Sequence, residues 1–171
     1  AASDVYKRQI LLYPAVSNKL AERHQAEMIS RYEQTVEELP KTDMKSEWEK
    51  AVKYNESVTG MSVEDPFILG SGSVLPGNYK DVLNVEEKEG VMGYIEIPAI
   101  DVMLPIYHGV SERVLRRGVG HMETTALPIG GKGTHSVLAS HRGLSTAKLF
   151  TDLDRMKEGD LFYICLLYTS P

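Results

Sequence analysis

Apolar residues recur at helical spacing between residues 17 and 39, with charged residues in the intervening positions. This pattern predicts an amphipathic helix. Pro40 is expected to end it, and Thr42 or Asp43 to cap a second helix that runs to Thr59. The predicted apolar faces are Leu20, His24, Met28, Tyr32, Val36 and Leu39 in the first helix, and Met44, Trp48, Ala51, Val52 and Val58 in the second. Together they predict a helical hairpin over residues 17–60.

The hydrophobic pattern then loses its period over residues 61–80. Several Pro and Gly residues punctuate this stretch. A loop of this length in a compact domain is usually a lid, a binding loop or a linker. We therefore expect a functional loop here.

The pattern changes to that of a β structure over residues 81–164. Branched apolar residues predict strands, and Ser111 can cap a short helix that ends before Gly118. The expected strands are 91–97, 100–106, 134–141 and 161–164, with a glycine-rich turn at 130–133 and a helical turn at 147–153. The fold class is therefore α+β and mainly β.

Both ends of the chain fit this pattern poorly. Residues 1–16 open without Met, and their apolar stretch at 10–13 is far shorter than the roughly 20 residues that span a bilayer. We interpret 1–16 as a non-native start joined to the end of a membrane anchor. Residues 165–171 break off within an apolar strand pattern, so we expect the native domain to continue past Pro171 and regard this tail as suspect.

The composition is that of one globular domain. Of 171 residues, 42% are hydrophobic and 25% are charged, which is enough to form a core. The net charge is -5 and no basic stripe is present, which argues against a nucleic-acid partner. The one cysteine, Cys165, excludes an intramolecular disulfide and a cysteine-rich zinc site. It lies in an apolar run of the suspect tail, so we expect an inert residue and not a nucleophile.

His141 is the main candidate for a catalytic residue. It ends a predicted strand and precedes Arg142, which puts its imidazole at the rim of a sheet, where a general acid/base is expected. The alternative is a histidine whose ring bonds a local backbone carbonyl, and position alone favours that alternative.

The remaining histidines do not predict a metal site. His135 and His141 are about 20 Å apart if they lie on one strand, so one ion cannot bind both. We expect His108 and His121 to be surface or hydrogen-bonded residues, and His24 to pack on the apolar face of its helix.

Several blocks of sequence are more specific together than each is alone. They are VMGYIEIP at 91–98, LPIYHG at 104–109, GVGHM at 118–122, LPIGG at 127–131 and HSVLASHRGL at 135–144. This combination resembles the sortases, a family of cysteine transpeptidases. The resemblance implies a sortase-type β-barrel, incomplete here, and identifies His141 as the catalytic histidine.

A further motif lies in the long loop. Glu64-Asp65-Pro66-Phe67 resembles the Asp-Pro-aromatic lid motif of class C sortases, which polymerise pilins. The resemblance implies that Asp65, Pro66 and Phe67 belong to a lid over the active site. The alternative is an ordinary surface turn, because Asp-Pro is a common turn opener.

The resemblance also implies a reaction and a location. A class C sortase cleaves an LPXTG-like sorting signal between Thr and Gly and joins the pilin to a lysine amine, at the extracellular face of a Gram-positive cell membrane. No metal or organic cofactor is implied. The family's Thr-Leu-x-Thr-Cys motif and its downstream arginine have no counterpart in the 171 residues, so we expect this chain to be inactive. A non-catalytic cell-surface binding domain remains the alternative.

Overall fold

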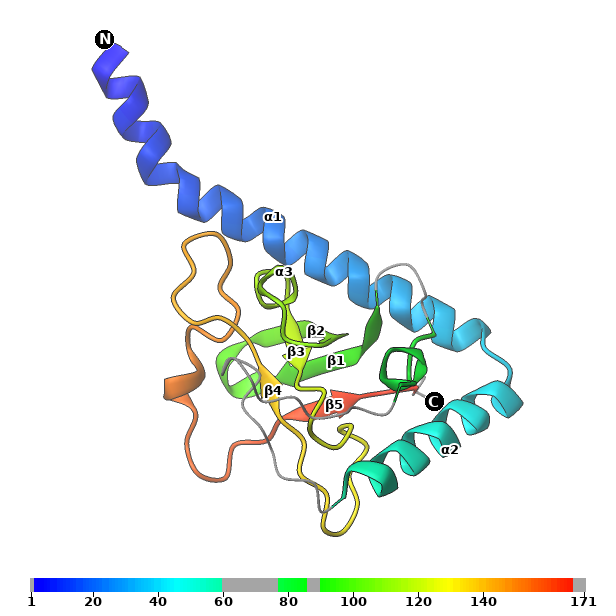
Figure 1. Cartoon of the computed structure of the whole chain (residues 1–171). Helices are drawn as coiled ribbons and strands as arrows, with labels where there is room; N and C mark the ends of the chain where they lie inside the picture. The colour runs from blue at the N-terminus through cyan, green and yellow to red at the C-terminus, as the bar shows by residue number, and fades with distance from the viewer. Residues whose placement is uncertain (1, 60–76, 86–89, 168–171) are drawn as a thin grey trace.

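The computed structural model describes residues 2–59, 77–85 and 90–167, with side chains from residue 13 onward. Helix α1 (Ala2–Glu38) lies along one side of a small sheet, and its N-terminal part projects away from it (Figure 1). Helix α2 (Lys41–Val58) follows a bend at Pro40 and covers another side. The helices diverge from this bend, so the predicted pair of helices is present but is not a closely packed hairpin.

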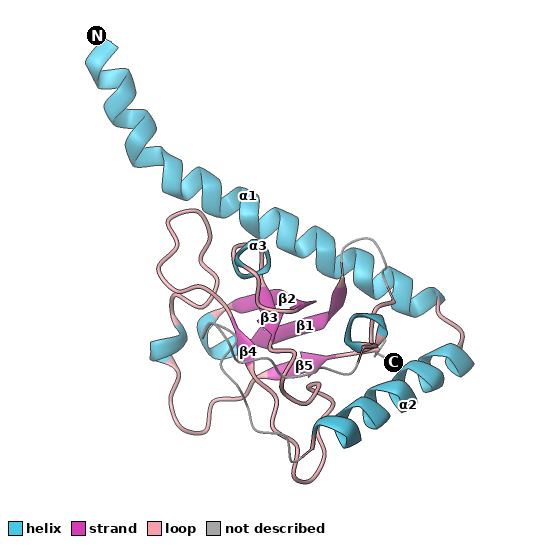
Figure 2. Ribbon diagram, viewed as in Figure 1, coloured by secondary structure: helices cyan, strands magenta, loops and turns pink. Residues whose placement is uncertain are grey.

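Over the described part of the chain, the sheet contains five strands in the order β4-β3-β2-β1-β5. The strands β2 and β3 are parallel and the other neighbours are antiparallel, so the sheet is mixed. Over the described residues β4 and β5 are its two edges, and it does not close into a barrel (Figure 2). The strands are β1 (Val91–Ile97), β2 (Val102–His108), β3 (Val119–His121), β4 (Leu138–Ala139) and β5 (Tyr163–Cys165). The short helices are η1 (Tyr79–Asp81), η2 (Pro98–Ile100), α3 (Glu112–Leu115) and η3 (Leu153–Arg155).

Two strand predictions need new boundaries. The second strand begins at Val102, because Pro98–Ile100 forms a helical turn that closes on Asp101 in the left-handed region, at φ 52°. The last strand lies at Tyr163–Cys165, so it includes the cysteine that we had placed in the tail. The short strand β3 was not predicted at all.

The strand predicted over residues 134–141 is also wrong, since β4 contains only two residues. The preceding segment is held by isolated bonds. Val137 O accepts from Met122 N at 2.9 Å, and His135 O accepts from Ala126 N at 2.9 Å. These bonds align the segment leading to His141 with the chain that follows β3.

The buried face of α1 lies further along the helix than the sequence pattern predicted. It consists of Gln25, Met28, Ile29, Tyr32 and Val36. Leu20 and His24 are exposed, although Asn18 and Gln25 on either side of them bond other segments of the chain, so these two side chains lie off the packed face of the helix. The helix also begins at Ala2, well before the predicted residue 17.

The predicted apolar face of α2 is partly wrong as well. Trp48 and Val52 are exposed, and the buried residues are Ala51, Tyr54, Asn55 and Val58. Pro40 occupies the N-cap position without a side-chain bond, so neither Thr42 nor Asp43 caps this helix. Tyr54 and Asn55 are buried because their polar atoms bond the chain at Glu123 and Leu127.

The core lies between the sheet and the two helices. Its largest fully buried side chains include Tyr32, Tyr54, Leu83, Met92, Ile106, Leu127 and Leu149. Tyr79, within the predicted functional loop, is buried here too.

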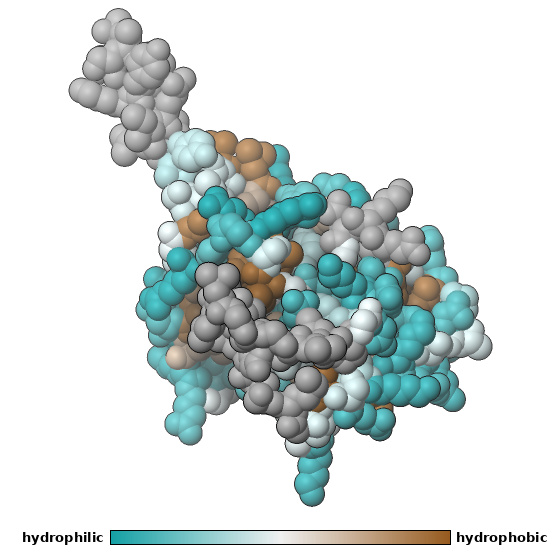
Figure 3. Space-filling view, viewed as in Figure 1, coloured by the Kyte–Doolittle hydropathy of each residue, from teal (hydrophilic) through white to brown (hydrophobic). Residues whose placement is uncertain are grey.

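The projecting part of α1 carries exposed apolar side chains at Tyr13, Val16 and Leu20. Hydrophobic surface is visible where the described side chains of α1 begin, while most of the other described residues on this face are hydrophilic (Figure 3). Among the helices in the described part of the chain, none combines the length and apolar character needed to cross a membrane.

Candidate functional site

His141 lies two residues after β4, at the rim of the sheet, with 31% of its side chain exposed. Its backbone oxygen accepts a hydrogen bond from Phe150 N at 3.2 Å. On the preceding residue, Ser140 Oγ donates to Gly118 O at 2.7 Å. The backbone is thus held on both sides while the imidazole stays accessible to solvent, as a group that exchanges protons with a substrate requires.

The ring of His141 contacts a carboxylate from a different element. Its Nε2 lies 3.2 Å from Oε2 of Glu112, the first residue of α3. The hydrogen-bond partner of the His141 ring is therefore an acidic side chain. It is not the local backbone carbonyl expected if the histidine had only a structural role.

Glu112 is itself held by its own helix. Arg116 donates its Nε–H to Oε1 of Glu112 at 2.6 Å, and Ser111 caps the turn by accepting from Val114 N at 3.4 Å. The hydrogen bond from Arg116, followed by the charge of His141, lowers the pKa of Glu112. The carboxylate is therefore ionised near neutral pH.

Glu112 was not recognised from the sequence. Its spacing to Arg116 is that of an ordinary helical ion pair, and nothing local indicates a partner 29 residues further on. The Ser111 cap was predicted correctly, but only the fold brings α3 beside the end of β4.

The loop after His141 is fixed by polar contacts. Gly143 adopts φ 75°, a conformation that favours glycine, and its N–H bonds Thr151 Oγ1 at 3.2 Å. Arg142 forms an ion pair with Asp154 at 2.9 Å. These contacts fix the turn that follows the imidazole.

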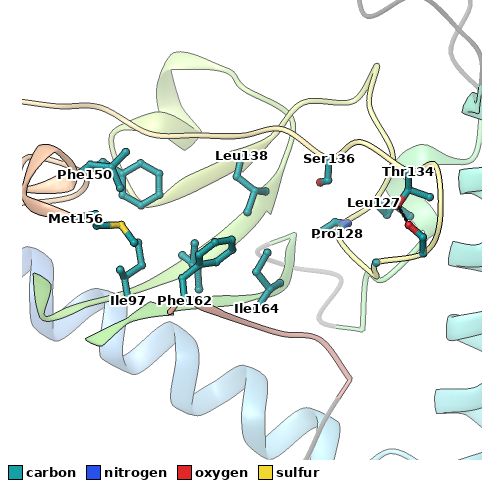
Figure 4. A pocket seen from close by; sticks show the side chains of 14 residues that line it. Ile97, Leu127, Pro128, Thr134, Ser136, Leu138, Phe150, Met156, Phe162 and Ile164 are labelled. Atoms are coloured by element: carbon teal, nitrogen blue, oxygen red, sulfur yellow. Dashed lines mark hydrogen bonds between the residues drawn. The ribbon is translucent and has the colours of Figure 1, made fainter. Parts of the chain in front are cut away.

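An apolar pocket of about 560 Å³ lies between β1, β5 and the segments around β4 (Figure 4). Side chains that point into it include Ile97, Leu138, Phe150, Met156, Phe162 and Ile164. Its described lining carries no ionisable side chain, and the buried Ser136 Oγ there has no hydrogen-bond partner among the described residues. The pocket can hold apolar groups but offers no acid or base of its own.

His121 and His108 have structural roles. His121 is fully buried, with Nε2 2.9 Å from Ala126 O, and burial lowers its pKa to about 4. The two ring nitrogens of His108 lie 3.1 Å from Gly90 O and 2.7 Å from Val82 O. Both rings are hydrogen-bonded, as expected, and His108 links residues 77–85 to the sheet.

The other candidate residues are placed as follows. His24 does not pack in the core: it is exposed and lies 3.3 Å from Arg117 Nη2. Cys165 is a half-buried free thiol opposite Tyr94. The predicted lid residues Asp65, Pro66 and Phe67 lie outside the described residues. Over the part of the chain that is described, no three potential metal-ligating side chains of His, Cys, Asp or Glu cluster.

Comparison with known proteins identifies relatives of one kind. The family model of the sortase domain matches residues 95–168. A structure of Streptococcus pneumoniae sortase C, reported with its pilin substrate specificity, is 40% identical, with a TM-score of 0.70 over 82% of this chain and 68% of that one.

Two further relatives agree with this result. Streptococcus agalactiae sortase C1 is 36% identical, with a TM-score of 0.71 over 84% of this chain and 72% of that one. Sortase A of Listeria monocytogenes is 29% identical over 133 residues, which are 77% of this chain. The chain spans only 52% of the length of that curated relative.

Proposed function

The chain belongs to the sortase family, and on that premise we propose that it is part of a pilus-assembly sortase. Such an enzyme cleaves an LPXTG-like sorting signal at the Thr-Gly bond and joins the pilin to a lysine amine of the next subunit. The observation that carries this proposal is the similarity to sortases C from two streptococci, at 36–40% identity over more than four-fifths of the chain. The proposed location is the extracellular face of a Gram-positive cell membrane.

In this proposal His141 is the general acid/base. A cysteine thiolate attacks the scissile carbonyl, and the imidazolium gives its proton to the leaving amine. The ring then takes a proton from the incoming lysine amine as the new amide forms and the thiolate departs. The accessible rim position of His141 and its tethered backbone support this role.

The first test replaces His141 by Ala in the full-length gene product. Transpeptidation of a fluorescent sorting peptide should fall by about 10² to 10⁴-fold, the usual contribution of a positioned acid/base. The exposed His135 provides a matched control, and His135→Ala should keep its activity. Full activity in His141→Ala, with the thermal transition unchanged, would assign proton transfer to another residue.

A second test addresses the 171-residue chain itself. We expect it neither to cleave the peptide nor to form a thioester, because the family's Thr-Leu-x-Thr-Cys motif is not among its residues and Cys165 does not match it. Intact mass spectrometry after incubation with peptide measures the thioester directly. Turnover by this chain, or an adduct that is absent in Cys165→Ala, would show that our assignment of the active site is wrong. Specific peptide binding without turnover in the full-length gene product would instead favour the non-catalytic surface domain.

We also propose that Asp65, Pro66 and Phe67 form a lid over the active site. Pro66 fixes the backbone between an acidic and an aromatic side chain, which could cover a cationic group and a thiol. In a Cys165→Ala background of the full-length gene product, Asp65→Ala combined with Phe67→Ala should speed labelling of the nucleophilic thiol, because the closed population no longer protects it. An unchanged labelling rate would leave these residues as a surface turn.

A further inference from the structure

The contact between Glu112 and His141 defines which ring nitrogen can act. A carboxylate is a hydrogen-bond acceptor only, whereas a neutral imidazole has one donor and one acceptor nitrogen. Glu112 Oε2 lies 3.2 Å from Nε2, so Nε2 carries the hydrogen in this contact. The lone pair of the neutral ring is then on Nδ1.

The carboxylate of Glu112 is also held in place by a contact that does not involve the histidine. Its other oxygen, Oε1, accepts from Arg116 Nε at 2.6 Å, and Arg116 lies one turn further along the same capped helix. Each oxygen therefore has its own partner, and rotation of the carboxylate away from His141 breaks both bonds. The lowered pKa of Glu112 is consistent with a permanently ionised acceptor.

The contact is too exposed to contribute much to stability. The side chains of Glu112 and His141 are 61% and 31% exposed, and pairs of this kind contribute little to folding. Its effect is local: the partner of one ring nitrogen sets the tautomer and the orientation of the ring. The arrangement has the form of a base oriented by a third group.

We propose that Glu112 is the positioning residue of His141 and that Nδ1 is the nitrogen that exchanges protons with the substrate. This inference rests on the proposed function of His141. In acylation the imidazolium loses the Nδ1 proton to the leaving amine as the C–N bond breaks, which leaves the neutral ring protonated at Nε2. In the second step Nδ1 takes a proton from the attacking amine as the C–S bond breaks and the thiolate is restored. Nε2–H stays bonded to Glu112 throughout.

The first measurement uses this chain without any substrate. Ring ¹⁵N signals of the histidines, with His141 identified by its loss in His141→Ala, report the tautomer of the neutral ring. We expect a single Nε2–H tautomer in the natural sequence and shifts averaged between the two tautomers in Glu112→Ala. The control is Glu158→Ala, which removes another exposed glutamate. An averaged or Nδ1–H ring in the natural sequence, or no change in Glu112→Ala, overturns the proposal.

The second measurement uses the full-length gene product. Glu112→Gln should lower kcat by roughly two- to fivefold with little change in KM, since an exposed pair has only a small effect. Arg116→Gln should act in the same direction, and Glu158→Gln should have no effect. Full activity of Glu112→Gln together with an inactive His141→Ala overturns this inference and leaves the proposed function intact. Full activity of His141→Ala overturns the proposed function, while the ring signals still report on Glu112.

Discussion

Replacement of Asn55 should weaken the contact between α2 and the segment that leads to β4. Asn55 is 4% exposed, and its amide makes two hydrogen bonds with the backbone of one residue. Its Nδ2 donates to Leu127 O at 3.0 Å, and its Oδ1 accepts from Leu127 N at 2.7 Å. An apolar side chain cannot accept a hydrogen bond from Leu127 N.

The expected loss of stability follows from Leu127 N–H alone, because Leu127 O also accepts from Ile129 N at 2.8 Å. A buried backbone group left without a partner costs about 1 to 3 kcal/mol, so Asn55→Ala should cost about 1 to 3 kcal/mol. For a chain of this size each kcal/mol lowers the Tm by about 2 to 4 °C, which predicts a fall of about 2 to 12 °C. Asn55→Asp should also be destabilising, because a carboxylate oxygen replaces the donor that faces Leu127 O.

Urea denaturation followed by circular dichroism measures this effect. The control is Glu56→Ala, because Glu56 is the exposed next residue of the same helix and its replacement should change the free energy of unfolding by less than about 0.5 kcal/mol. If Asn55→Ala unfolds at the same urea concentration as the natural sequence, Leu127 N–H has found another acceptor and Asn55 does not hold this segment against α2.

Three further predictions concern the sheet. Tyr79→Phe should cost about 1 to 3 kcal/mol in thermal denaturation, because its hydroxyl lies 2.9 Å from His121 Nδ1 and accepts from Gly109 N at 3.0 Å; an unchanged transition would contradict this. Burial lowers the pKa of His121 to about 4, below an unfolded value of about 6.5. Between these two pKa values the unfolded chain therefore binds more protons than the folded chain. About 3 kcal/mol of stability that is present above pH 6.5 should be lost as the pH falls to 4. This dependence of the free energy of unfolding on pH should vanish in His121→Gln. In hydrogen exchange, residues 161–164 should exchange faster than β2, since β5 is an edge strand in the described sheet and its first side chains are exposed; protection equal to that of β2 in a monomer would refute this.

Local patterns predicted the elements whose residues determine them alone. The limits of β1 at Val91–Ile97 were predicted correctly, because branched residues run between Gly90 and Pro98. The Ser111 cap and the break at Pro40 also follow from chemistry within a few residues. The sortase resemblance was confirmed by the comparisons, since it depends on motifs read in order along the chain.

Features that depend on distant contacts were missed. In α1, the sequence alone does not show which side of the helix faces the rest of the protein, so Leu20 and His24 were wrongly assigned to the packed face. The strand β3 has three residues, with Gly120 in its middle, and such a segment has almost no pattern to detect. A Cβ on Gly120 would clash with Gly109 O, so the close approach of two backbones explains this glycine.

The candidate site was predicted only in part for the same reason. The local sequence around His141 indicated a rim position, and the structure agrees. The pairing of β3 with β4 places the first residue of α3 beside the end of β4. This tertiary arrangement brings the carboxylate of Glu112 to the imidazole. No spacing rule within one element could have found this partner.

The contacts of α1 have a consequence for synthesis on the ribosome. Asn18 Oδ1 accepts from Lys148 N at 2.6 Å, across 130 residues of sequence, and Gln25 Nε2 donates to Arg117 O across 92. At roughly 5 to 20 residues per second, α1 waits on the order of 6 to 26 s before Lys148 is made. The apolar face of α1 packs earlier, on β1 and β2, which end at His108, so a nascent chain stalled before that residue exposes this face and is a natural target for chaperones. The polar contacts of α1 with Arg117 and Lys148 form only later.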